Sequence, residues 1–406
     1  MKKQTICIVG LGYIGLPTAS LLANSGYDVS GVDINQHAVD TINQGGIHII
    51  EPDLDAFVRA AVVSKRLQAF TTPQPADIFM ICVPTPFHEG GDIPQPNLDY
   101  VVAATRSVAP LVKPGNMVIL ESTSPVGTTR QMADVLQEAG VDLSQVHVAY
   151  CPERVLPGKI MVELLENDRV VGGLTPAATA AVADFYRSFV RGEVLETDAP
   201  TAEMCKLTEN SYRDVNIAFA NELSLLCDKA GINVWKLIAL ANRHPRVNIL
   251  QPGAGVGGHC IAVDPWFIVA SDPVNARVIR AARDVNNRKT QWVIEQIKLA
   301  VADASAKTGR KPRIACLGLA FKPDIDDLRE SPAVHIADAL KSQGYDVVAV
   351  EPNIETHPSF ELVALEDALA SADVVAILVK HRQFVAQAKS GGFGVASVLD
   401  FCGVQR

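Results

Sequence analysis

The stretch TICIVGLGYIGLPTASLLANSGYDVSGVDIN, residues 5–35, decides the fold. An apolar run typical of a buried strand leads into a glycine-rich turn, the helical pattern Leu16–Ala23 follows, and a second strand ends at Asp33. The turn has the spacing G-x-G-x-x-G, with its glycines at Gly10, Gly12 and Gly15. That spacing alone is weak evidence, but a strand before it, a helix after it and an acidic residue at the end of the next strand predict a dinucleotide-binding fold.

Each residue of this segment has its own physical role. Gly10 permits the tight turn, Gly12 lets the backbone approach a pyrophosphate, and Gly15 allows the helix and the strand to pack closely. The start of the helix stabilises the negative charge of the phosphates. Asp33 can accept hydrogen bonds from ribose hydroxyls and would repel a 2′-phosphate, and neither Ile34 nor the residue after it is an arginine. We therefore predict NAD rather than NADP as the cofactor; the alternative is a glycine-rich turn that binds nothing.

Composition argues against two classes of partner. The chain has 406 residues, of which 48% are hydrophobic and 20% charged, and this predicts two or three globular domains. A net charge of −9 argues against nucleic acid, because surfaces that bind a phosphate backbone are basic. No run approaches the roughly 18 apolar residues of a membrane span. The first apolar run is also too short for a secretory signal, so we expect a cytoplasmic protein.

The eight cysteines are scattered and show neither a C-x-x-C pair nor zinc-like spacing. Cys7, Cys82 and Cys316 lie in strand-like apolar runs, where a cysteine is usually a small buried hydrophobe. Cys260 differs, because glycines surround it in GVGGHCIAVDP, residues 255–265. His259 beside it raises the alternative of a metal site. Adjacent residues rarely reach one ion, and no second cluster completes a tetrahedral shell, so we predict no metal.

Two further strands end in loops at one edge of the predicted sheet. ADIFMICVPTP, residues 76–86, ends in a proline-containing loop, and NMVILESTSPVGTT, residues 116–129, ends in hydroxyl side chains and a turn. Parallel sheets bind ligands beyond the carboxyl ends of their strands. Thr123 is therefore a candidate site residue, against the alternative of an ordinary threonine at a strand end.

One long helix is predicted at residues 201–230, which contain no glycine or proline. Lys206 and Asn210 are four residues apart and lie on one face of that helix. Such a pair is either a solvated polar face or two groups that point at a common target.

The last third of the chain repeats the first. RIACLGLAFK, GYDVVAVEPN and ADVVAILVKH follow the order of TICIVGLGYIG, GYDVSGVDIN and ADIFMICVPTP. The second copy lacks the glycines after Gly318, so we expect it to have lost the pyrophosphate site. The predicted fold is α/β, with two Rossmann-like doubly wound parallel sheets. We place a NAD-binding domain at 1–200, a central helical domain with the cysteine loop at 201–300, and a second Rossmann-like domain at 301–406, which either binds another phosphorylated ligand or covers the cleft.

These motifs resemble the UDP-glucose/GDP-mannose dehydrogenase family along essentially the whole chain. The matching segments are GLGYIGLP, VPTP, ESTSPVGTT, CPERVLPG, KLTENSYRDVNIAFANEL, GVGGHC with Asp264, and GLAFKPDIDDLRESP. The resemblance implies two nucleotide-binding domains joined by a helical dimerisation domain, and hence a homodimer or higher homo-oligomer. It makes the domain at 301–406 the nucleotide-sugar-binding domain. It also implies a four-electron oxidation of a sugar CH₂OH to a carboxylate with two NAD.

The resemblance gives the unusual cysteine a role. An alcohol first loses hydride to become an aldehyde, the Cys260 thiolate adds to it, the thiohemiacetal loses a second hydride, and water hydrolyses the resulting thioester. Lys206 and Asn210 would donate to the oxygen that becomes negative in each addition. Asp264 would hold a water or help to position Lys206, and Glu153 would activate the hydrolytic water with Thr123 as its partner.

The resemblance also implies two sets of binding residues. At the cofactor it places Gly10, Gly12, Tyr13, Ile14, Gly15, Asp33, Val83, Pro84, Thr85, Thr123 and Arg329. At the UDP-sugar it places Glu153, Arg154, Leu156, Lys206, Asn210, Arg213, Arg243, Arg246, Gly257 and Lys322. Either Arg243 or Arg246 could reach the site of a neighbouring subunit.

The sugar is expected to be an N-acetylhexosamine. The glucose and mannose branches of the family carry G-G-S-C and a lysine before the aspartate, where this chain has His259 and Val263. The segments around them are most similar to the branch that acts on UDP-N-acetyl-D-mannosamine, with UDP-N-acetylglucosamine as the alternative substrate. The uronate product suits bacterial surface polysaccharides such as enterobacterial common antigen.

Two alternatives belong to other classes. A non-catalytic NAD-binding module would need neither the thiol nor the lysine and asparagine pair. A 3-hydroxyacid dehydrogenase shares the first sheet and that pair, but performs one oxidation and has no catalytic cysteine.

Overall fold

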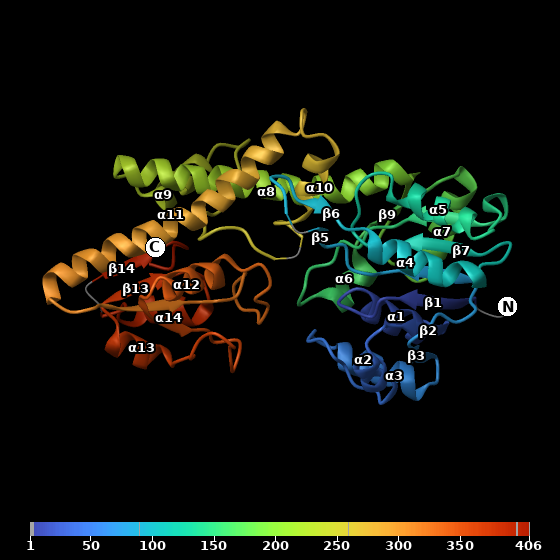
Figure 1. Cartoon of the computed structure of the whole chain (residues 1–406), viewed down its shortest axis with the longest axis horizontal. Coiled ribbons are helices and arrows are strands. Elements are labelled where there is room, and N and C mark those ends of the chain that lie inside the picture. The colour runs from blue at the N-terminus through green and yellow to red at the C-terminus, as the bar shows by residue number, and fades with distance from the viewer. Residues whose placement is uncertain (1–3, 89, 259, 395–396, 406) are drawn as a thin grey trace. The chain divides into compact units, whose positions relative to one another are not determined.

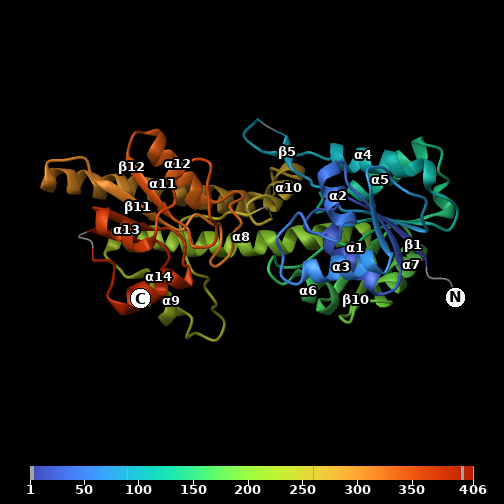
Figure 2. The same cartoon turned by 90° about the horizontal axis from the view of Figure 1, so that it is seen from below.

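The computed structural model describes residues 4–88, 90–258, 260–394 and 397–405. The chain divides into two compact units, Met1–Thr208 and Glu209–Arg406, coloured blue to green and green to red in Figure 1. The boundary falls within helix α8 (Ala199–Ala230), which Figure 2 shows as one continuous helix. The long helix expected at 201–230 is therefore present, while the domain limits at residues 200 and 300 stay a prediction.

The first unit is built on an eight-stranded sheet in the order β10-β9-β8-β7-β4-β1-β2-β3. Its strands are β1 (Thr5–Val9), β2 (Asp28–Val32), β3 (Leu67–Phe70), β4 (Ile78–Ile81), β7 (Met117–Leu120), β8 (His147–Tyr150), β9 (Arg169–Gly173) and β10 (Val194–Asp198). All neighbouring strands are parallel except β8 and β9. A short hairpin of β5 (Phe87–His88) and β6 (Gln95–Pro96) lies outside this sheet.

Helices cover both faces of the first sheet. They are α1 (Gly15–Asn24), α2 (Gln36–Asn43), α3 (Leu54–Val63), α4 (Asp99–Val108), α5 (Thr128–Glu138), α6 (Ile160–Glu166) and α7 (Pro176–Arg187), with single turns at Ala109–Leu111 and Leu143–Gln145. Alternate strand residues enter different cores: Ile6 and Ile8 pack with α1, α3, α6 and α7, whereas Cys7 and Val9 pack with α4 and α5. This two-sided burial explains the continuous apolar runs in the sequence.

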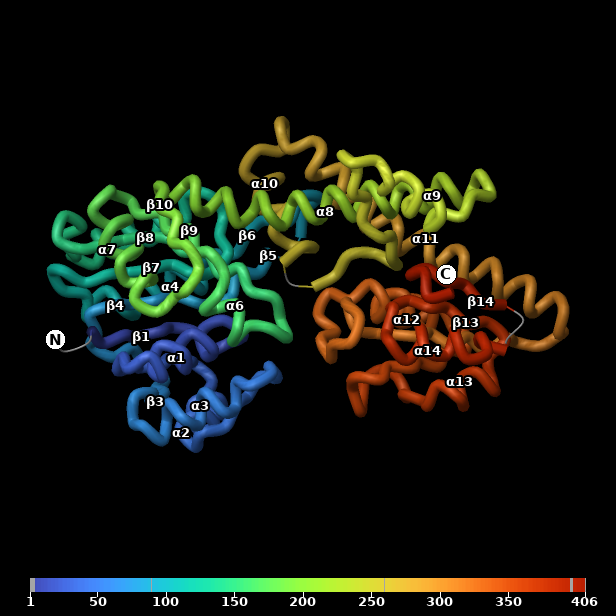
Figure 3. The backbone as a smooth tube through the Cα atoms, turned by 180° about the vertical axis from the view of Figure 1, so that it is seen from behind, coloured from blue at the N-terminus to red at the C-terminus, as the bar shows by residue number. Residues whose placement is uncertain are grey.

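The second unit is built on a four-stranded parallel sheet in the order β12-β11-β13-β14. Its strands are β11 (Arg313–Leu317), β12 (Asp346–Val350), β13 (Val374–Ile377) and β14 (Ser397–Asp400). Its helices are α9 (Val234–Ala241), α10 (Asp264–Ser271), α11 (Arg277–Thr308), α12 (Pro332–Ser342), α13 (Leu365–Ser371) and α14 (Arg382–Ser390). Helix α11 packs against β13, β14 and α12, as Figure 3 shows from behind. The prediction of two Rossmann-like sheets is confirmed.

The predicted repeat extends to the turns after the first strands. Gly10 and Gly318 have φ of 94° and 95°, and each donates its N–H to the last carbonyl of the next strand in sequence at 2.8 Å. The second copy then departs, because α12 begins only at Pro332 and no helix starts directly after the turn. Glu351 is 5% exposed and accepts the N–H groups of Leu319 and Ala320 at 2.7 and 2.9 Å, so its carboxylate is used within the fold.

Among the described residues, no helix is both long enough and apolar enough to cross a membrane.

Candidate active site

The glycine turn of the first unit leaves room for a dinucleotide. A Cβ on Gly15 would lie 1.8 Å from the carbonyl oxygen of Gly10, so α1 can begin this close to β1 only with glycine. A Cβ on Gly12 would meet no atom within 4 Å. The start of α1 is thus open on that side, as a pyrophosphate site requires. Tyr13 and Ile14 complete the turn and are half-buried.

Asp33 lies at the end of β2 and is held by the turn itself. Its Oδ2 accepts the N–H of Leu11 at 3.0 Å, and its Oδ1 accepts the N–H of Asn35 at 2.9 Å. Each carboxylate oxygen keeps a second lone pair that a ribose hydroxyl can use. The half-buried position and fixed orientation therefore fit the adenosine ribose of NAD.

His48 is a residue that sequence reasoning missed at this place. Burial lowers the pKa of its imidazole, and the charge of Asp33 and a hydrogen bond with the Leu11 backbone oppose that shift. Its Nδ1 is buried without a hydrogen-bond partner in the part of the chain that the structure describes. No local pattern marks this histidine, because the loop between α2 and α3 brings it to the turn.

The loops after β4 and β7 are joined to each other. Ser122 Oγ donates to the Val83 carbonyl at 2.6 Å, and Thr85 Oγ1 donates to the Thr123 carbonyl at 2.6 Å. The structure therefore brings together Val83, Pro84 and Thr85 with the loop that carries Thr123. The Thr123 side chain is half-buried at the carboxyl edge of the sheet, where ligands of such folds bind.

Glu153 follows β8 and forms a buried ion pair. Its Oε2 accepts from Nη1 of Arg169 at 2.7 Å, and its Oε1 accepts the backbone N–H of Arg154 at 2.6 Å. Glu153 is 6% and Arg169 2% exposed. These two contacts fix the orientation of the Glu153 carboxylate, and each oxygen retains a lone pair for a water molecule. Arg169, the first residue of β9, was not expected from the sequence.

Glu121, directly after β7, adds a second buried carboxyl to this cluster. Its Oε1 accepts from the Tyr186 hydroxyl at 2.5 Å, and its Oε2 accepts from the Cys82 thiol at 3.3 Å. Burial raises the pKa of Glu121 to about 7; the charge of Glu153 adds to the increase, while Arg169 and the two hydrogen bonds oppose it. Glu121 opens the ESTSPVGTT segment, and only the fold shows that it is buried.

Arg154 and Leu156 occupy the loop between β8 and α6. Arg154 is half-buried and Leu156 is exposed. The buried carboxylate of Glu51 accepts the N–H groups of Gly158 and Ile160, each at 2.8 Å, and so fixes the end of this loop against the start of α6. Arg154 and Leu156, the two residues expected at the sugar, therefore lie in a loop whose end is fixed by hydrogen bonds to Glu51.

Lys206 lies on α8 and is 8% exposed. Within the described chain, no hydrogen bond or ion pair engages its ammonium group. A shielded cation whose three donors are available suits an oxygen that acquires negative charge. Asn210 follows one turn later on the same helix face.

Cys260 is the exposed member of the eight cysteines. Its carbonyl oxygen accepts the N–H groups of Val263 and Asp264 at 3.1 and 2.8 Å, in the turn that starts α10. Asp264 is 3% exposed and its Oδ2 accepts from Nδ2 of Asn210 at 2.5 Å. The second unit thus brings together Cys260, Asp264 and Asn210, whereas a role of Asp264 toward Lys206 stays a prediction.

The glycines before Cys260 are required by close packing. A Cβ on Gly257 would lie 2.3 Å from the carbonyl oxygen of Glu330, and one on Gly258, where φ is 85°, would lie 2.8 Å from the ring of Phe321. The N–H of Gly258 also donates to the carbonyl of Arg329 at 3.2 Å. The sequence suggested a close approach to the sugar or a tight turn; the structure adds contact with the segment after β11.

The remaining expected residues of the second unit are less enclosed. Lys322 is half-buried in the same segment, and the Arg329 guanidinium pairs with Asp327 at 2.6 Å. The other three arginines, Arg213, Arg243 and Arg246, are exposed. Within the described residues, no hydrogen bond or ion pair joins the side chains of these three arginines to one another.

A buried network of hydrogen bonds joins the cysteine loop to α8 and α11. The Asn221 side chain accepts the N–H of Gly253 at 2.9 Å and donates to Asn286 at 2.9 Å. Asn286 donates to Asp214 at 2.7 Å, and Arg283 pairs with Asp214 at 2.6 Å. Asn221 and Asp214 are on the helix that carries Asn210, so one helix positions both the amide and the loop.

Among the described residues, no group of histidine, cysteine and carboxylate side chains is arranged to hold a metal ion. His259, on which the alternative of a metal site depended, lies outside the described residues.

Comparison with known proteins identifies three matching family models. Residues 4–190 match the NAD-binding domain of the UDP-glucose/GDP-mannose dehydrogenase family, residues 200–288 its central domain, and residues 315–398 its UDP-binding domain. The matches cover the segments that carry the glycine turn, the cysteine loop and Lys322 respectively.

Two curated relatives are similar over nearly the whole chain. One is a UDP-N-acetyl-D-mannosamine dehydrogenase from Escherichia coli strain K12, 58% identical over 95% of each chain. The other is an NDP-N-acetyl-D-galactosaminuronic acid dehydrogenase from Ralstonia nicotianae, 57% identical over 94% of this chain and 92% of that protein. A solved UDP-D-ManNAc dehydrogenase from Pyrococcus horikoshii has a TM-score of 0.88 and 39% identity, and the match covers 99% of this chain and 96% of that one.

Proposed function

Because the chain belongs to the UDP-glucose/GDP-mannose dehydrogenase family and is a NAD-dependent dehydrogenase, we propose that it oxidises C6 of UDP-N-acetyl-D-mannosamine twice, to the uronate. The single observation that carries the two-step reaction is the exposed Cys260, whose loop is hydrogen-bonded to Asp264 and, through it, to Asn210. A dehydrogenase that performs one oxidation needs no such thiol.

NAD accepts the hydride in each oxidation. The residues that hold it are Gly10, Gly12 and Gly15 at the pyrophosphate and Asp33 at the ribose, with Val83–Thr85 and Thr123 lining the sheet edge. Arg329 is proposed to reach the cofactor as well. The open space at Gly12 and the fixed carboxylate of Asp33 support this assignment.

The chain's own groups then supply the rest of the chemistry. The alcohol loses a proton and a hydride to become an aldehyde, and the Cys260 thiolate adds to its carbonyl carbon. Lys206 and Asn210 stabilise the alkoxide that forms. Loss of the second hydride gives a thioester, and water cleaves it to the carboxylate while the thiolate leaves. Per sugar, one water is consumed and two hydrides are removed.

Hydrolysis is assigned to the cluster of the first unit. Glu153 accepts the proton of the attacking water, and Thr123 holds that water. The ion pair with Arg169 orients the Glu153 carboxylate, and the hydrogen bond from Thr85 orients the backbone of Thr123. Asp264 accepts from Asn210 and in this way keeps the amide directed toward the reacting oxygen.

The UDP moiety is assigned to the UDP-binding domain and the sugar to the loop after β8. Lys322 is proposed to contact the uridine or its phosphates. Arg154 and Leu156 are proposed to line the sugar, and Gly257 to let the cysteine loop approach it. The exposed Arg213, Arg243 and Arg246 remain candidates for the phosphates, with Arg243 or Arg246 supplied by a neighbouring subunit.

We further propose a homodimer formed through α8. Tyr212, Phe219 and Leu226 recur every seven residues on this helix and are 69%, 53% and 57% exposed. A stripe of large apolar side chains on one helix face is typical of a helix interface. We place the enzyme in the cytoplasm, where its product would feed a surface-polysaccharide pathway.

The sugar is the part of the proposal that a substrate panel tests. NADH formation at 340 nm is compared for UDP-N-acetyl-D-mannosamine, UDP-N-acetylglucosamine, UDP-N-acetylgalactosamine and UDP-glucose. The highest kcat/KM is expected for UDP-N-acetyl-D-mannosamine. The main alternative is UDP-N-acetylgalactosamine, because a 57% identical relative is an NDP-N-acetyl-D-galactosaminuronic acid dehydrogenase. A higher kcat/KM for that sugar would overturn the choice of substrate and leave the proposed chemistry intact.

A further inference from the structure

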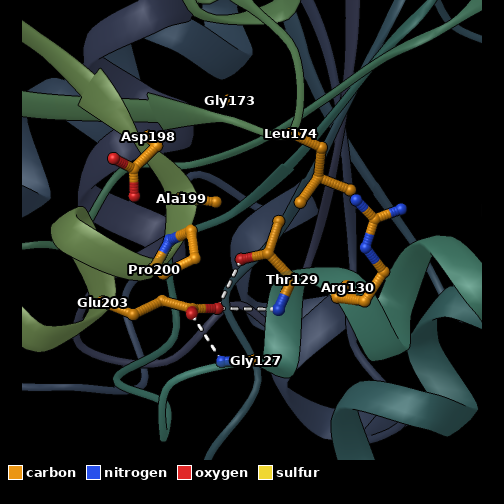
Figure 4. A pocket seen from close by; sticks show the side chains of 9 residues that line it. All are labelled: Gly127, Thr129, Arg130, Gly173, Leu174, Asp198, Ala199, Pro200 and Glu203. Carbon is orange, nitrogen blue, oxygen red and sulfur yellow. Dashed lines mark hydrogen bonds between the residues drawn. The ribbon is translucent and has the colours of Figure 1, made fainter.

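The start of helix α5 is capped by a side chain from another helix. Glu203 of α8 is 0% exposed, and its carboxylate accepts the N–H of Gly127 at 2.7 Å, the N–H of Thr129 at 2.7 Å and the Thr129 hydroxyl at 2.6 Å (Figure 4). Gly127 is the N-cap residue of α5 and offers no side chain of its own. Glu203 therefore satisfies N–H groups that every helix start leaves without an intrahelical partner.

Groups of the proposed chemistry lie on α8 and in the loop that leads into α5, the two segments that Glu203 joins. Thr123 lies four residues before Gly127 in the loop that leads into α5. Lys206 lies three residues after Glu203, about one turn further along α8. All of these residues belong to the first unit. A shift of α8 relative to α5 would thus change the position of Lys206 relative to Thr123.

A pocket interrupts the packing between the two helices beside Glu203. A cavity of about 250 Å³ lies beside the Glu203 carboxylate, lined from α5 by Arg130 and from the start of α8 by Pro200. Figure 4 shows the carboxylate of Glu203, which also lines this pocket, directed toward Thr129 and the backbone of Gly127. Packing between the two helices is thus interrupted at this point, and the three hydrogen bonds of the Glu203 carboxylate join α8 directly to the start of α5.

We propose that Glu203 is a positioning residue, which sets the place of Lys206 relative to Thr123 by joining α8 to the start of α5. The proposal rests on the catalytic roles proposed for these two residues. Glu203 itself touches neither substrate nor cofactor. Its loss should therefore lower turnover far more than it weakens the binding of NAD, which depends mainly on the glycine turn and Asp33.

Two variants of Glu203 and one control test this. Glu203→Gln keeps the size but places an NH₂ group against N–H donors, and Glu203→Asp keeps the charge but shortens the side chain by one methylene. The matched control is Asp77→Asn. Asp77 also accepts two hydrogen bonds, from the N–H and hydroxyl of Thr5 at 2.8 and 2.9 Å, but it joins the amino ends of β1 and β4.

Each variant is measured for kcat with UDP-N-acetyl-D-mannosamine, for the Kd of NADH by fluorescence, and for the melting temperature. Because a misplacement of about 1 Å costs on the order of 100-fold in rate, we expect both Glu203 variants to lose about 10- to 100-fold in kcat with less than a twofold change in Kd. Glu203→Asp should melt closer to the wild type than Glu203→Gln does, and still turn over slowly. Asp77→Asn should lower the melting temperature and leave kcat unchanged.

A wild-type kcat in either Glu203 variant would overturn the proposal. The proposal would also be overturned if the Glu203 variants and Asp77→Asn lost the same proportion of kcat for each degree by which the melting temperature falls. Failure of the proposed function is distinguishable from both results, because the wild-type enzyme itself would then form no NADH with any UDP-sugar.

Discussion

The side chain of Asn210 donates a 2.5 Å hydrogen bond to Oδ2 of Asp264, and the backbone N–H of Asp264 donates in turn to the carbonyl of Cys260 at 2.8 Å. A residue of the long helix α8 is thereby connected to the turn that carries the exposed thiol. The amide orientation and the position of the thiol are consequently set by one short chain of contacts. We infer that the amide donor and the nucleophile act as a unit.

Asn210→Ala should lower kcat by about 100- to 1,000-fold, because removal of one oxyanion donor typically costs that much. It also leaves the buried carboxylate of Asp264 with one hydrogen bond fewer. Asn216→Ala is the matched control: Asn216 lies on the same helix and donates to the Tyr212 carbonyl at 2.7 Å. Equal turnover by the two variants would contradict the role of Asn210.

Gly257→Ala should impair turnover through the loop backbone, because the new Cβ would lie 2.3 Å from the carbonyl oxygen of Glu330. Gly253→Ala, in the same loop, places its Cβ no nearer than 3.9 Å to any atom and should behave as the wild type. Steady-state kcat and the rate of Cys260 alkylation by iodoacetamide report the displacement. If Gly257→Ala turns over normally, the loop is not held against the segment after β11.

Asp33→Asn should weaken NAD binding and reduce discrimination against NADP. The amide keeps one acceptor but loses the charge that repels a 2′-phosphate, and a hydrogen bond to a charged group contributes about 1.5–3 kcal/mol. We expect the ratio of kcat/KM for NAD to that for NADP to fall at least about tenfold. An unchanged ratio would show that another residue selects the cofactor.

Glu121 should make the stability of the first unit depend on pH. Burial raises its pKa from 4.5 to about 7, so between these values the folded protein holds a proton that the unfolded chain releases. The stabilisation is complete below pH 4.5 and is lost as the pH rises through about 7, with a total on the order of 3 kcal/mol.

Glu121→Gln carries no titrating group and should escape this loss. The melting temperature of the wild type relative to Glu121→Gln should therefore fall between pH 5.5 and pH 8.5. The same difference at both pH values would mean that Glu121 is already ionised at the lower one.

Much of the fold could be predicted from the sequence because its signals are local. The glycine spacing at residues 10–15, the apolar strand runs and the uninterrupted helix at 201–230 each follow from short-range rules, and the second sheet follows from its repeat of the first. The reversal of β9 against β8 could not be predicted, since strand direction depends on how the chain returns to the sheet.

The site was predictable only where residue type and motif coincide. Gly12, Asp33 and Cys260 stand in patterns whose chemistry is recognisable. Arg169 and Glu203 do not stand in such patterns. The local sequence does not indicate that an arginine in a strand or a glutamate in a helix is buried, because burial depends on how β9 and α8 pack. Their partners, Glu153 and the start of α5, are distant in sequence.

The most direct test of the two-step reaction is the number of NADH molecules formed per UDP-N-acetyl-D-mannosamine at the end point, with NAD in excess. The wild type should form two NADH and one uronate per sugar, and Cys260→Ser should release no uronate, while Cys227→Ala, which alters a buried cysteine of α8, should still give two. One NADH per sugar from the wild type, or full uronate formation by Cys260→Ser, would contradict the central role of Cys260.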